Sequence, residues 1–181
     1  HDFNLFVPTQ KMFISDFHVD SHNRFYFGGI QNFTVMDKNG NVIKKYQESD
    51  GCSGIIVKFV ELSDSRLAVI GSGSLIQVLN VGGDSVVVES IVKLPFFSTY
   101  DVLLASDGKL YMATDGDGLW RVDTDLSEKS EFEHILSYGE QPKELNKIYA
   151  MMQSADNDIW LGTQMGGVFR LSLDREKGVN Y

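Results

Sequence analysis

Two nearly matching segments lie 49 residues apart in the sequence, and this repeat constrains the fold more than any other feature. Residues 107–123 align without a gap on residues 156–172, and weaker copies begin near Asn23 and Ser65. A period of about 40–50 residues with short apolar stretches is typical of propellers and solenoids. The repeat therefore predicts that copies of one small supersecondary unit stack side by side.

A single apolar position registers the four units on one another. The spacings between successive copies are 42, 43 and 49 residues, for Phe25, Leu67, Leu110 and Ile159. Apolar stretches of four to six residues, with a turn every eight to twelve, favour an all-β fold. The only stretch compatible with a helix is 140–149, where Pro142 could occupy a first turn.

The repeat favours a propeller over a sandwich. Propeller blades pack face to face, so the same apolar positions recur in each blade, whereas the strands of a sandwich need not repeat. We therefore expect an all-β fold, a partial β-propeller of about four blades of antiparallel four-stranded sheets. The whole chain, 1–181, is expected to be one propeller fragment, with blades at about 12–47, 53–92, 97–136 and 145–181.

The last unit has few apolar residues left for a fourth strand after residue 173. An open array of blades would also leave strand edges unpaired, which promotes association. A homodimer through the open blade edges or the propeller face could cover them, or further blades could. The chain begins at His1 without a signal segment, so we expect it to be part of a longer polypeptide.

Composition excludes several classes of partner. The chain has 16 Lys and Arg against 25 Asp and Glu, a net charge of −9, which disfavours nucleic acids and anionic membrane surfaces. Cys52 is the single cysteine, so the sequence holds neither a disulfide framework nor a cysteine-clustered zinc site. The apolar runs are much shorter than the ~20 residues that span a bilayer. We therefore expect no direct membrane contact in this segment.

Residues 156–170 resemble the two-component regulator propeller repeat. They read as an acidic turn followed by Ile-Trp-Leu-Gly-Thr and then Gly-Gly-Val-Phe-Arg. The third unit is similar, with Leu-Tyr-Met-Ala-Thr at 110–114 and Gly-Leu-Trp-Arg at 118–121. The first two units keep the β pattern and glycines but lose the Trp and Arg. The chain thus resembles part of one propeller of that family.

This resemblance implies the periplasmic sensor region of a hybrid two-component histidine kinase of the Bacteroides type. The parent protein would be anchored in the inner membrane and would respond to an oligosaccharide or another small ligand. Two alternatives stay open: a secreted carbohydrate-active hydrolase or lyase on the same fold, and a scaffold for protein contacts.

The sequence offers no pattern for catalysis, a cofactor or a metal. The Asp-rich turn that starts at Asp123 has Glu128 and His134 where a calcium-binding EF-hand needs Gly and Glu. His18 and His22 would face together on a helix but not on the strand and turn expected here. Nucleophile-elbow, zinc-protease and phosphate-loop motifs are also missing. We expect no catalytic residue, no cofactor and no metal, and hence a non-enzymatic segment.

The last spacing between registering positions, 49 residues, is six longer than the one before, 43, and the extra residues fall between Glu133 and Leu145. A loop that the blade does not need is a common place for binding residues. Tyr138, Glu140 and Gln141 are therefore the candidate ligand-binding residues, and the alternative is a solvated linker.

Conspicuous residues that recur are better explained by packing. Trp120 and Trp160 stand at repeated strand positions, which places them in the core between blades rather than against a sugar ring. Arg121 and Arg170 also recur, and we expect them to tie one blade to the next.

Overall fold

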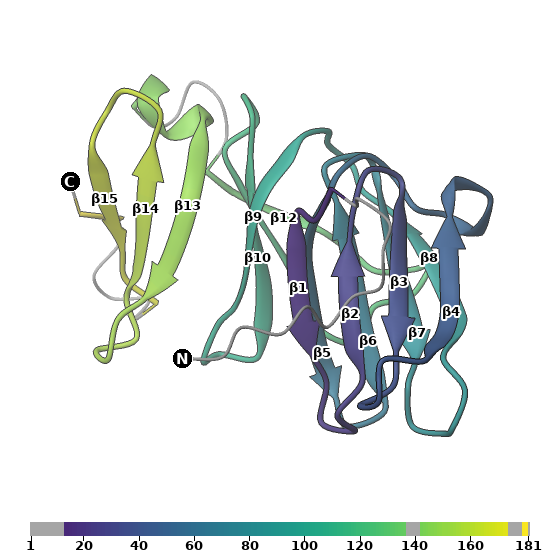
Figure 1. Cartoon of the computed structure of the whole chain (residues 1–181). Helices are drawn as coiled ribbons and strands as arrows, with labels where there is room; N and C mark the ends of the chain where they lie inside the picture. Colours follow the sequence, from purple (N-terminus) through teal and green to yellow (C-terminus); the bar gives the residue numbers. More distant parts are fainter. Residues whose placement is uncertain (1–12, 137–141, 174–178, 181) are drawn as a thin grey trace, which may run out of the picture.

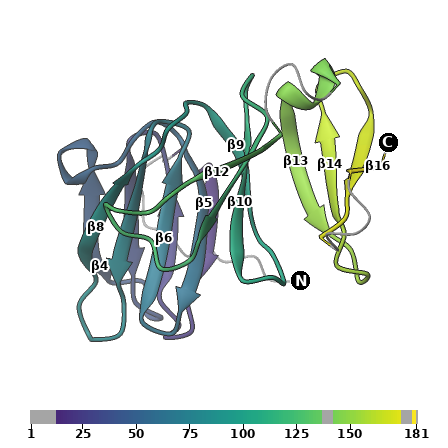
Figure 2. The same ribbon diagram turned by 180° about the vertical axis from the view of Figure 1, so that it is seen from behind.

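The computed structural model describes residues 13–136, 142–173 and 179–180. The chain forms four antiparallel sheets of four strands each, and within every sheet the strands follow the order of the sequence. Figure 1 shows the sheets standing side by side, with the fourth at the left. Seen from behind, in Figure 2, the second sheet stands in front of the first. The expected fold, a partial propeller of four-stranded blades, is confirmed.

The strands of the first sheet are β1 (Asp16–Val19), β2 (Phe25–Gly28), β3 (Asn32–Met36) and β4 (Val42–Gln47). Those of the second are β5 (Ile56–Ser63), β6 (Arg66–Gly71), β7 (Leu75–Asn80) and β8 (Val87–Lys93). The third sheet has β9 (Thr99–Leu104), β10 (Lys109–Thr114), β11 (Leu119–Asp123) and β12 (Glu133–Leu136). The fourth has β13 (Ile148–Gln153), β14 (Ile159–Thr163), β15 (Val168–Leu171) and β16 (Val179–Asn180).

The fourth sheet differs from expectation in having a fourth strand. Only two residues form β16, and they pair with Arg170 and Leu171 of β15. The described part of the stretch expected to favour a helix, 142–149, contains a 3-10 turn, η2 (Lys143–Asn146), directly after Pro142. β13 follows it from Ile148 onward. A second 3-10 turn, η1, spans Glu48–Asp50. Neither these turns nor any other described helix is long or apolar enough to cross a membrane.

The registering position occupies the same place in all four sheets. It lies on the second strand of each sheet, opposite an apolar residue of the third strand. The four pairs are Phe25 and Met36, Leu67 and Leu79, Leu110 and Val122, and Ile159 and Leu171. The turn before this position needs a left-handed residue, and Gly108 (φ 77°) and Asn157 (φ 66°) supply it in the last two sheets.

The sheets pack face to face with their inner strands β1, β5, β9 and β13 in contact along the row. We call the face toward the preceding sheet the leading face and the opposite face the trailing face. Side chains alternate between faces along a strand. The leading faces carry Phe25 and Phe27, Leu67 and Val69, Leu110 and Met112, and Ile159 and Leu161 on their second strands. The trailing faces carry Tyr26, Ala68 and Ile70, Tyr111 and Ala113, and Trp160 and Gly162.

Each of the three junctions between neighbouring sheets holds one apolar cluster. Trp120 belongs to the second junction, where its ring lies 5.2 Å from that of Phe96, so its expected place between blades is confirmed. Trp160 is on the trailing face of the fourth sheet, and no described sheet covers that face. The expected place of Trp160 between blades therefore stays a prediction, since Tyr111 holds the same position in the third sheet and is buried at the third junction.

Candidate functional site: a groove between the third and fourth sheets

The residue just before the registering position spans the gap between sheets in the first two junctions. Arg24 lies there in the first sheet, with 6% of its surface exposed. It pairs with Asp20 and donates to the carbonyl oxygens of Val81 and Gly83, the latter at 2.9 Å, in the β7–β8 loop of the second sheet. The guanidinium therefore fills this end of the first junction.

Arg66 has the same role in the second junction. Its guanidinium donates to the carbonyl oxygens of Leu126, at 2.7 Å, and Thr124, at 3.5 Å, in the β11–β12 loop of the third sheet. Glu89 of its own sheet pairs with it at 2.9 Å. Backbone carbonyls are good acceptors for a planar cation with several donors. Both arginines thus close the space between adjacent sheets.

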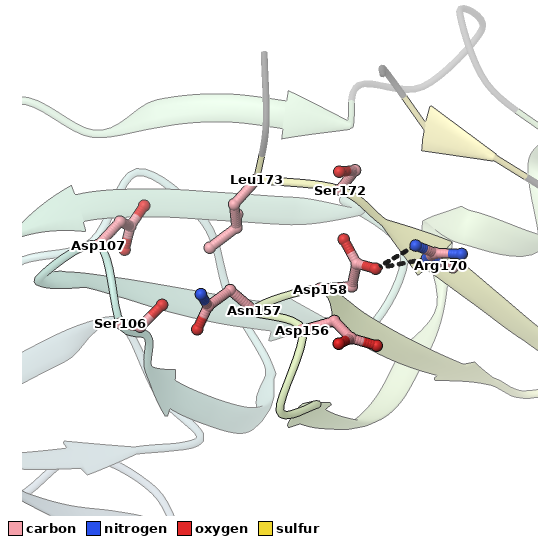
Figure 3. Close-up of a pocket in the computed structure, with 8 residues that line it drawn as sticks. All are labelled: Ser106, Asp107, Asp156, Asn157, Asp158, Arg170, Ser172 and Leu173. Carbon is pink, nitrogen blue, oxygen red and sulfur yellow. Dashed lines mark hydrogen bonds and ion pairs between the residues drawn. The ribbon is translucent and has the colours of Figure 1, made fainter. Parts of the chain in front are cut away.

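The third junction has a different residue at this position and opens into a groove. Lys109 replaces the arginine and pairs with Asp123 of its own sheet. Beside it is a hollow of about 590 Å³ lined by both sheets (Figure 3). Its lining residues are Ser106, Asp107, Asp156, Asn157, Asp158, Arg170, Ser172 and Leu173.

A second hollow of about 630 Å³ adjoins the first, because both are lined by Asp107, Ser172 and Leu173. The residues that line only the second hollow are Lys109, Tyr111, Arg121, Glu133, Ile135 and Leu171. We call the two hollows together the junction groove. Leu173 lies two residues after the third-strand partner of the registering position, as Val81 and Thr124 do in the second and third sheets. The backbone carbonyls of Val81 and Thr124 accept hydrogen bonds from Arg24 and Arg66.

The charged groups of the junction groove are held in place by partners in their own sheets. Arg170 donates to the Asp158 carboxylate at 2.6 Å, the pair drawn in Figure 3. Arg121 pairs with Glu133 and donates to the Tyr111 hydroxyl at 3.2 Å. The expectation that these arginines tie one blade to the next is therefore wrong. Each lies on a third strand, beside partners of the same sheet.

The Tyr111 hydroxyl lies at the centre of this arrangement. It donates to the Asp107 carboxylate at 2.8 Å and accepts from Arg121. Burial, more than these polar neighbours, raises the pKa of Tyr111 to about 12. The phenol therefore stays protonated at neutral pH, and its proton is donated to Asp107, which lines both hollows of the groove.

Polar contacts brace the two walls of the groove. Ser106 on the third sheet donates its backbone N–H to Gln153 of the fourth, and the Gln153 amide donates back to the serine hydroxyl, both at 2.8 Å. At the opposite end of the junction, Asp115 pairs with Lys147 at 2.9 Å and accepts from Tyr100 at 2.8 Å. Polar contacts thus join the two sheets on both sides of the apolar cluster.

The groove is lined by hydrogen-bond donors and acceptors together with the apolar residues Ile135, Leu171 and Leu173. Such a lining suits a ligand rich in hydroxyl groups, which donates to carboxylates and accepts from guanidinium groups. Within the residues that the structure describes, no group of three or more His, Cys, Asp or Glu could hold a metal ion.

The candidates chosen from sequence, Tyr138, Glu140 and Gln141, lie outside the described residues. The groove residues were missed because they belong to the repeat itself. One signal was present in the sequence: the position before the registering residue reads Arg, Arg, Lys and Asp in the four units. The third unit has Lys109 where the first two have an arginine, and the junction that follows this unit is the one that contains the groove.

Comparison with known proteins shows the fold. No protein-family model matches the chain, and no curated protein matches it. A solved structure named as the extracellular domain of the hybrid two-component system BT3049 of B. thetaiotaomicron has a TM-score of 0.66 and 15% identity, over 93% of this chain and 21% of that one. A second such domain, of BT4673 from the same organism, has a TM-score of 0.62 and 19% identity, over 92% of this chain and 21% of that one.

The β-propeller domain of Cps50 (Swd1) from Myceliophteria thermophila is also similar, with a TM-score of 0.69 and 14% identity, over 96% of this chain and 57% of that one. The chain therefore spans about a fifth of the length of the extracellular domains and over half of the Cps50 domain. All three likenesses support the assignment of the fold as part of a β-propeller.

Proposed function

We propose that the chain is a ligand-sensing propeller segment of the extracytoplasmic region of a two-component sensor histidine kinase, and that it responds to an oligosaccharide. The parent protein is anchored in the inner membrane and places this segment in the periplasm. The segment itself binds and does not catalyse.

Two lines of support come from outside the groove. The repeats at 107–123 and 156–172 resemble the two-component regulator propeller repeat. Two of the similar structures carry names of extracellular domains of hybrid two-component systems. At 15% and 19% identity these likenesses show the fold, and the sensor role is our inference from them.

The observation that carries the ligand class is the junction groove. Its first hollow, of about 590 Å³, has polar residues on both walls. Lys109, which stands instead of a spanning arginine, lines the adjoining hollow of about 630 Å³. Cavities of roughly 300–1,000 Å³ commonly hold small ligands. Asp156 and Asn157 are exposed on one wall, and Asp107 is exposed on the other.

Signalling follows from the groove's position between two sheets. A ligand that contacts both walls binds best when the walls have one particular spacing. It shifts the sensor between two arrangements only by the difference in its affinity for them. The kinase would read that shift as a change in the spacing or angle of the blades.

The test is isothermal titration calorimetry of the chain against a panel of oligosaccharides. At least one glycan should bind, and Asp156→Ala should weaken it roughly tenfold or more, as expected for a lost hydrogen bond to a charged group. Asp64→Ala is the matched control, because Asp64 is the exposed residue at the same position of the second sheet. It should leave the affinity unchanged.

Two results would contradict the proposal in different ways. Release of reducing ends from a polysaccharide would favour the hydrolase or lyase on the same fold. Titrations without heat for every glycan, together with no change in the melting temperature, would favour the protein scaffold.

A further inference from the structure

Two tyrosines on inner strands meet across the third junction. Tyr100 lies on β9 and Tyr149 on β13, and their rings stack with centroids 4.4 Å apart and planes 14° from parallel. Tyr149 is 43% exposed and Tyr100 is half-buried. Both sheets of this junction belong to the described chain, so the stack does not depend on where the sequence begins or ends.

Each of the two tyrosines is the extra residue of a β-bulge. The pairing of β9 with β10 passes from Asp101 to Thr99, and that of β13 with β14 passes from Ala150 to Ile148. A bulged residue has no partner in the ladder, and the bulge changes the direction of its side chain. The two bulges therefore explain how rings from different sheets come to stack on each other.

The stacked phenols are linked to a carboxylate. The Tyr100 hydroxyl donates to one oxygen of Asp115 at 2.8 Å, and Lys147 pairs with the other oxygen at 2.9 Å. The hydrogen bond to Asp115 and the neighbouring Tyr149 hydroxyl raise the pKa of the Tyr100 phenol. This phenol is therefore protonated at neutral pH, and Asp115 is in place to take its proton.

The relative orientation of the rings brings particular carbon atoms together. The rings are nearly parallel, and the Tyr149 hydroxyl lies beside the Tyr100 hydroxyl. The ring carbons next to the two oxygens are therefore also close to each other. These are the carbons through which two oxidised phenols couple.

We propose that Tyr100 and Tyr149 form an oxidative cross-linking site, at which a peroxide acting through a haem peroxidase joins the third and fourth sheets by a dityrosine bond. Each phenol loses one electron and one proton, and the Tyr100 proton passes to Asp115 and then to solvent. The two phenoxyl radicals form one C–C bond between the carbons beside their oxygens. The hydrogens of these carbons then move to the oxygens, which restores both phenols. Hydrogen peroxide accepts the two electrons and two protons and leaves as two waters.

The cross-link has a consequence for stability. It closes a loop of about 50 residues between positions 100 and 149, and cross-links of this span stabilise mainly by restricting the unfolded chain. The melting temperature of the oxidised chain should therefore rise by roughly 10 °C. This inference is independent of the ligand proposed above.

The test is oxidation of the chain with hydrogen peroxide and a haem peroxidase, followed by trypsin digestion and mass spectrometry. Cleavage after Lys and Arg releases the peptides 94–109 and 148–170, each of which contains a single tyrosine. We expect a species with the summed mass of these two peptides less two hydrogen atoms, together with dityrosine fluorescence. The oxidised protein should still run as a single chain on a denaturing gel.

Substitutions separate this pair from the other tyrosines. Tyr100→Phe and Tyr149→Phe should each abolish the linked peptide, because phenylalanine forms no phenoxyl radical. Tyr46→Phe is the matched control and should leave the yield unchanged. Tyr46 stacks on Phe33 with nearly the same geometry, 4.4 Å and 13°, but its partner has no hydroxyl. Asp115→Asn should slow the coupling several-fold, because an amide is a poor acceptor for the phenol proton.

The other outcomes overturn the proposal. Failure to find the linked peptide in the folded, unmodified chain would refute the site, and this result requires no variant to fold. A linked peptide that forms equally well in urea would show that the stack is not its cause. Links that join only separate chains would place the reaction outside the junction. Coupling of Asp115→Asn at the unchanged rate would contradict the carboxylate as proton acceptor.

Discussion

The carboxylate of Asp101 on β9 accepts a hydrogen bond of 2.7 Å from the backbone N–H of Met151 on β13. The inner strand of the third sheet thereby holds the inner strand of the fourth. Asp16 on β1 does the same for the backbone N–H of Phe59 on β5, at 2.9 Å. Each aspartate lies on a first strand, opposite the residue that follows the registering position of the second strand by three. Asp101 is opposite Ala113, and Asp16 is opposite Gly28. The same hydrogen bond thus recurs in the first and third junctions, where it joins the inner strands of two neighbouring sheets that do not pair with each other as a ladder.

Replacing Asp101 with Ala should therefore destabilise the fold. The Met151 N–H would lose a charged acceptor, and hydrogen bonds of this kind contribute about 1.5–3 kcal/mol. Urea unfolding followed by circular dichroism measures the change. Asp101→Asn should cost less, because it keeps one acceptor oxygen. Equal losses for the two variants would show that the hydrogen bond is not the cause.

Arg24→Met should be among the most destabilising substitutions outside the apolar clusters. It would leave the Asp20 carboxylate, whose side chain is 0% exposed, without its cation. Breaking a buried ion pair on one side typically costs about 3–5 kcal/mol. The double variant Asp20→Asn with Arg24→Met should recover part of that loss in urea unfolding. If the loss of unfolding free energy in the double variant equalled the sum of the losses in the two single variants, the two residues would not be coupled.

The stability of the chain should fall in acid partly through Asp20. Burial raises the pKa of this carboxyl, but hydrogen bonds from Arg24 and Tyr26 lower it further than burial raises it, to below the ordinary 3.8. A group whose pKa is lowered by folding stabilises the protein above its unfolded pKa and loses that contribution as the pH falls through its folded pKa.

Asp20→Asn should therefore differ most from the unmodified chain near neutral pH and progressively less below about pH 4. Unfolding free energies from urea curves at several pH values measure the gap. A gap that stays constant into acid would contradict the assignment.

Gly118→Ala should be poorly tolerated. Gly118 has φ 65°, and a Cβ there would lie 1.9 Å from the carbonyl oxygen of Leu136. The left-handed backbone and the clash together should cost about 2 kcal/mol or more. Gly83→Ala is the matched control, because nothing lies within 4 Å of its Cβ position. Its stability should stay within about 0.5 kcal/mol of the unmodified chain. Similar melting temperatures for the two variants would refute the steric explanation.

The repeat was enough to predict the sheets. Leu110 and Ile159 recur in sequence because both must bury the same face against a preceding sheet, and period-2 alternation follows from the strand itself. The sheet face on which Trp120 and Trp160 lie could also be predicted from the strand alternation, counted from the registering positions Leu110 and Ile159. Which face is covered depends on how many sheets follow, and a pattern within one unit does not contain that number.

The junction groove was harder to predict for a physical reason. The acceptors of Arg24 and Arg66 are backbone carbonyls of loops 57–60 residues away, which any sequence supplies. The repeat therefore shows the arginines without showing their partners. The groove lies where Lys109 replaces such an arginine. The missing contact between this position and the next sheet can be recognised in the sequence only by comparing the third unit with the first two.

The uneven distribution of these arginines also makes the three junctions differ in chemistry. The first and second junctions each carry a guanidinium that donates to loop carbonyls of the next sheet. The third instead combines its apolar cluster with hydrogen bonds from Met151 to Asp101, from Gly116 and Gly118 to the Asn146 carbonyl and between Ser106 and Gln153, with the ion pair of Asp115 and Lys147 and with the stacked rings of Tyr100 and Tyr149. A molecule bound in the hollow would add a link between two sheets that no arginine spans, so occupancy of the groove and stiffness of this junction would rise together.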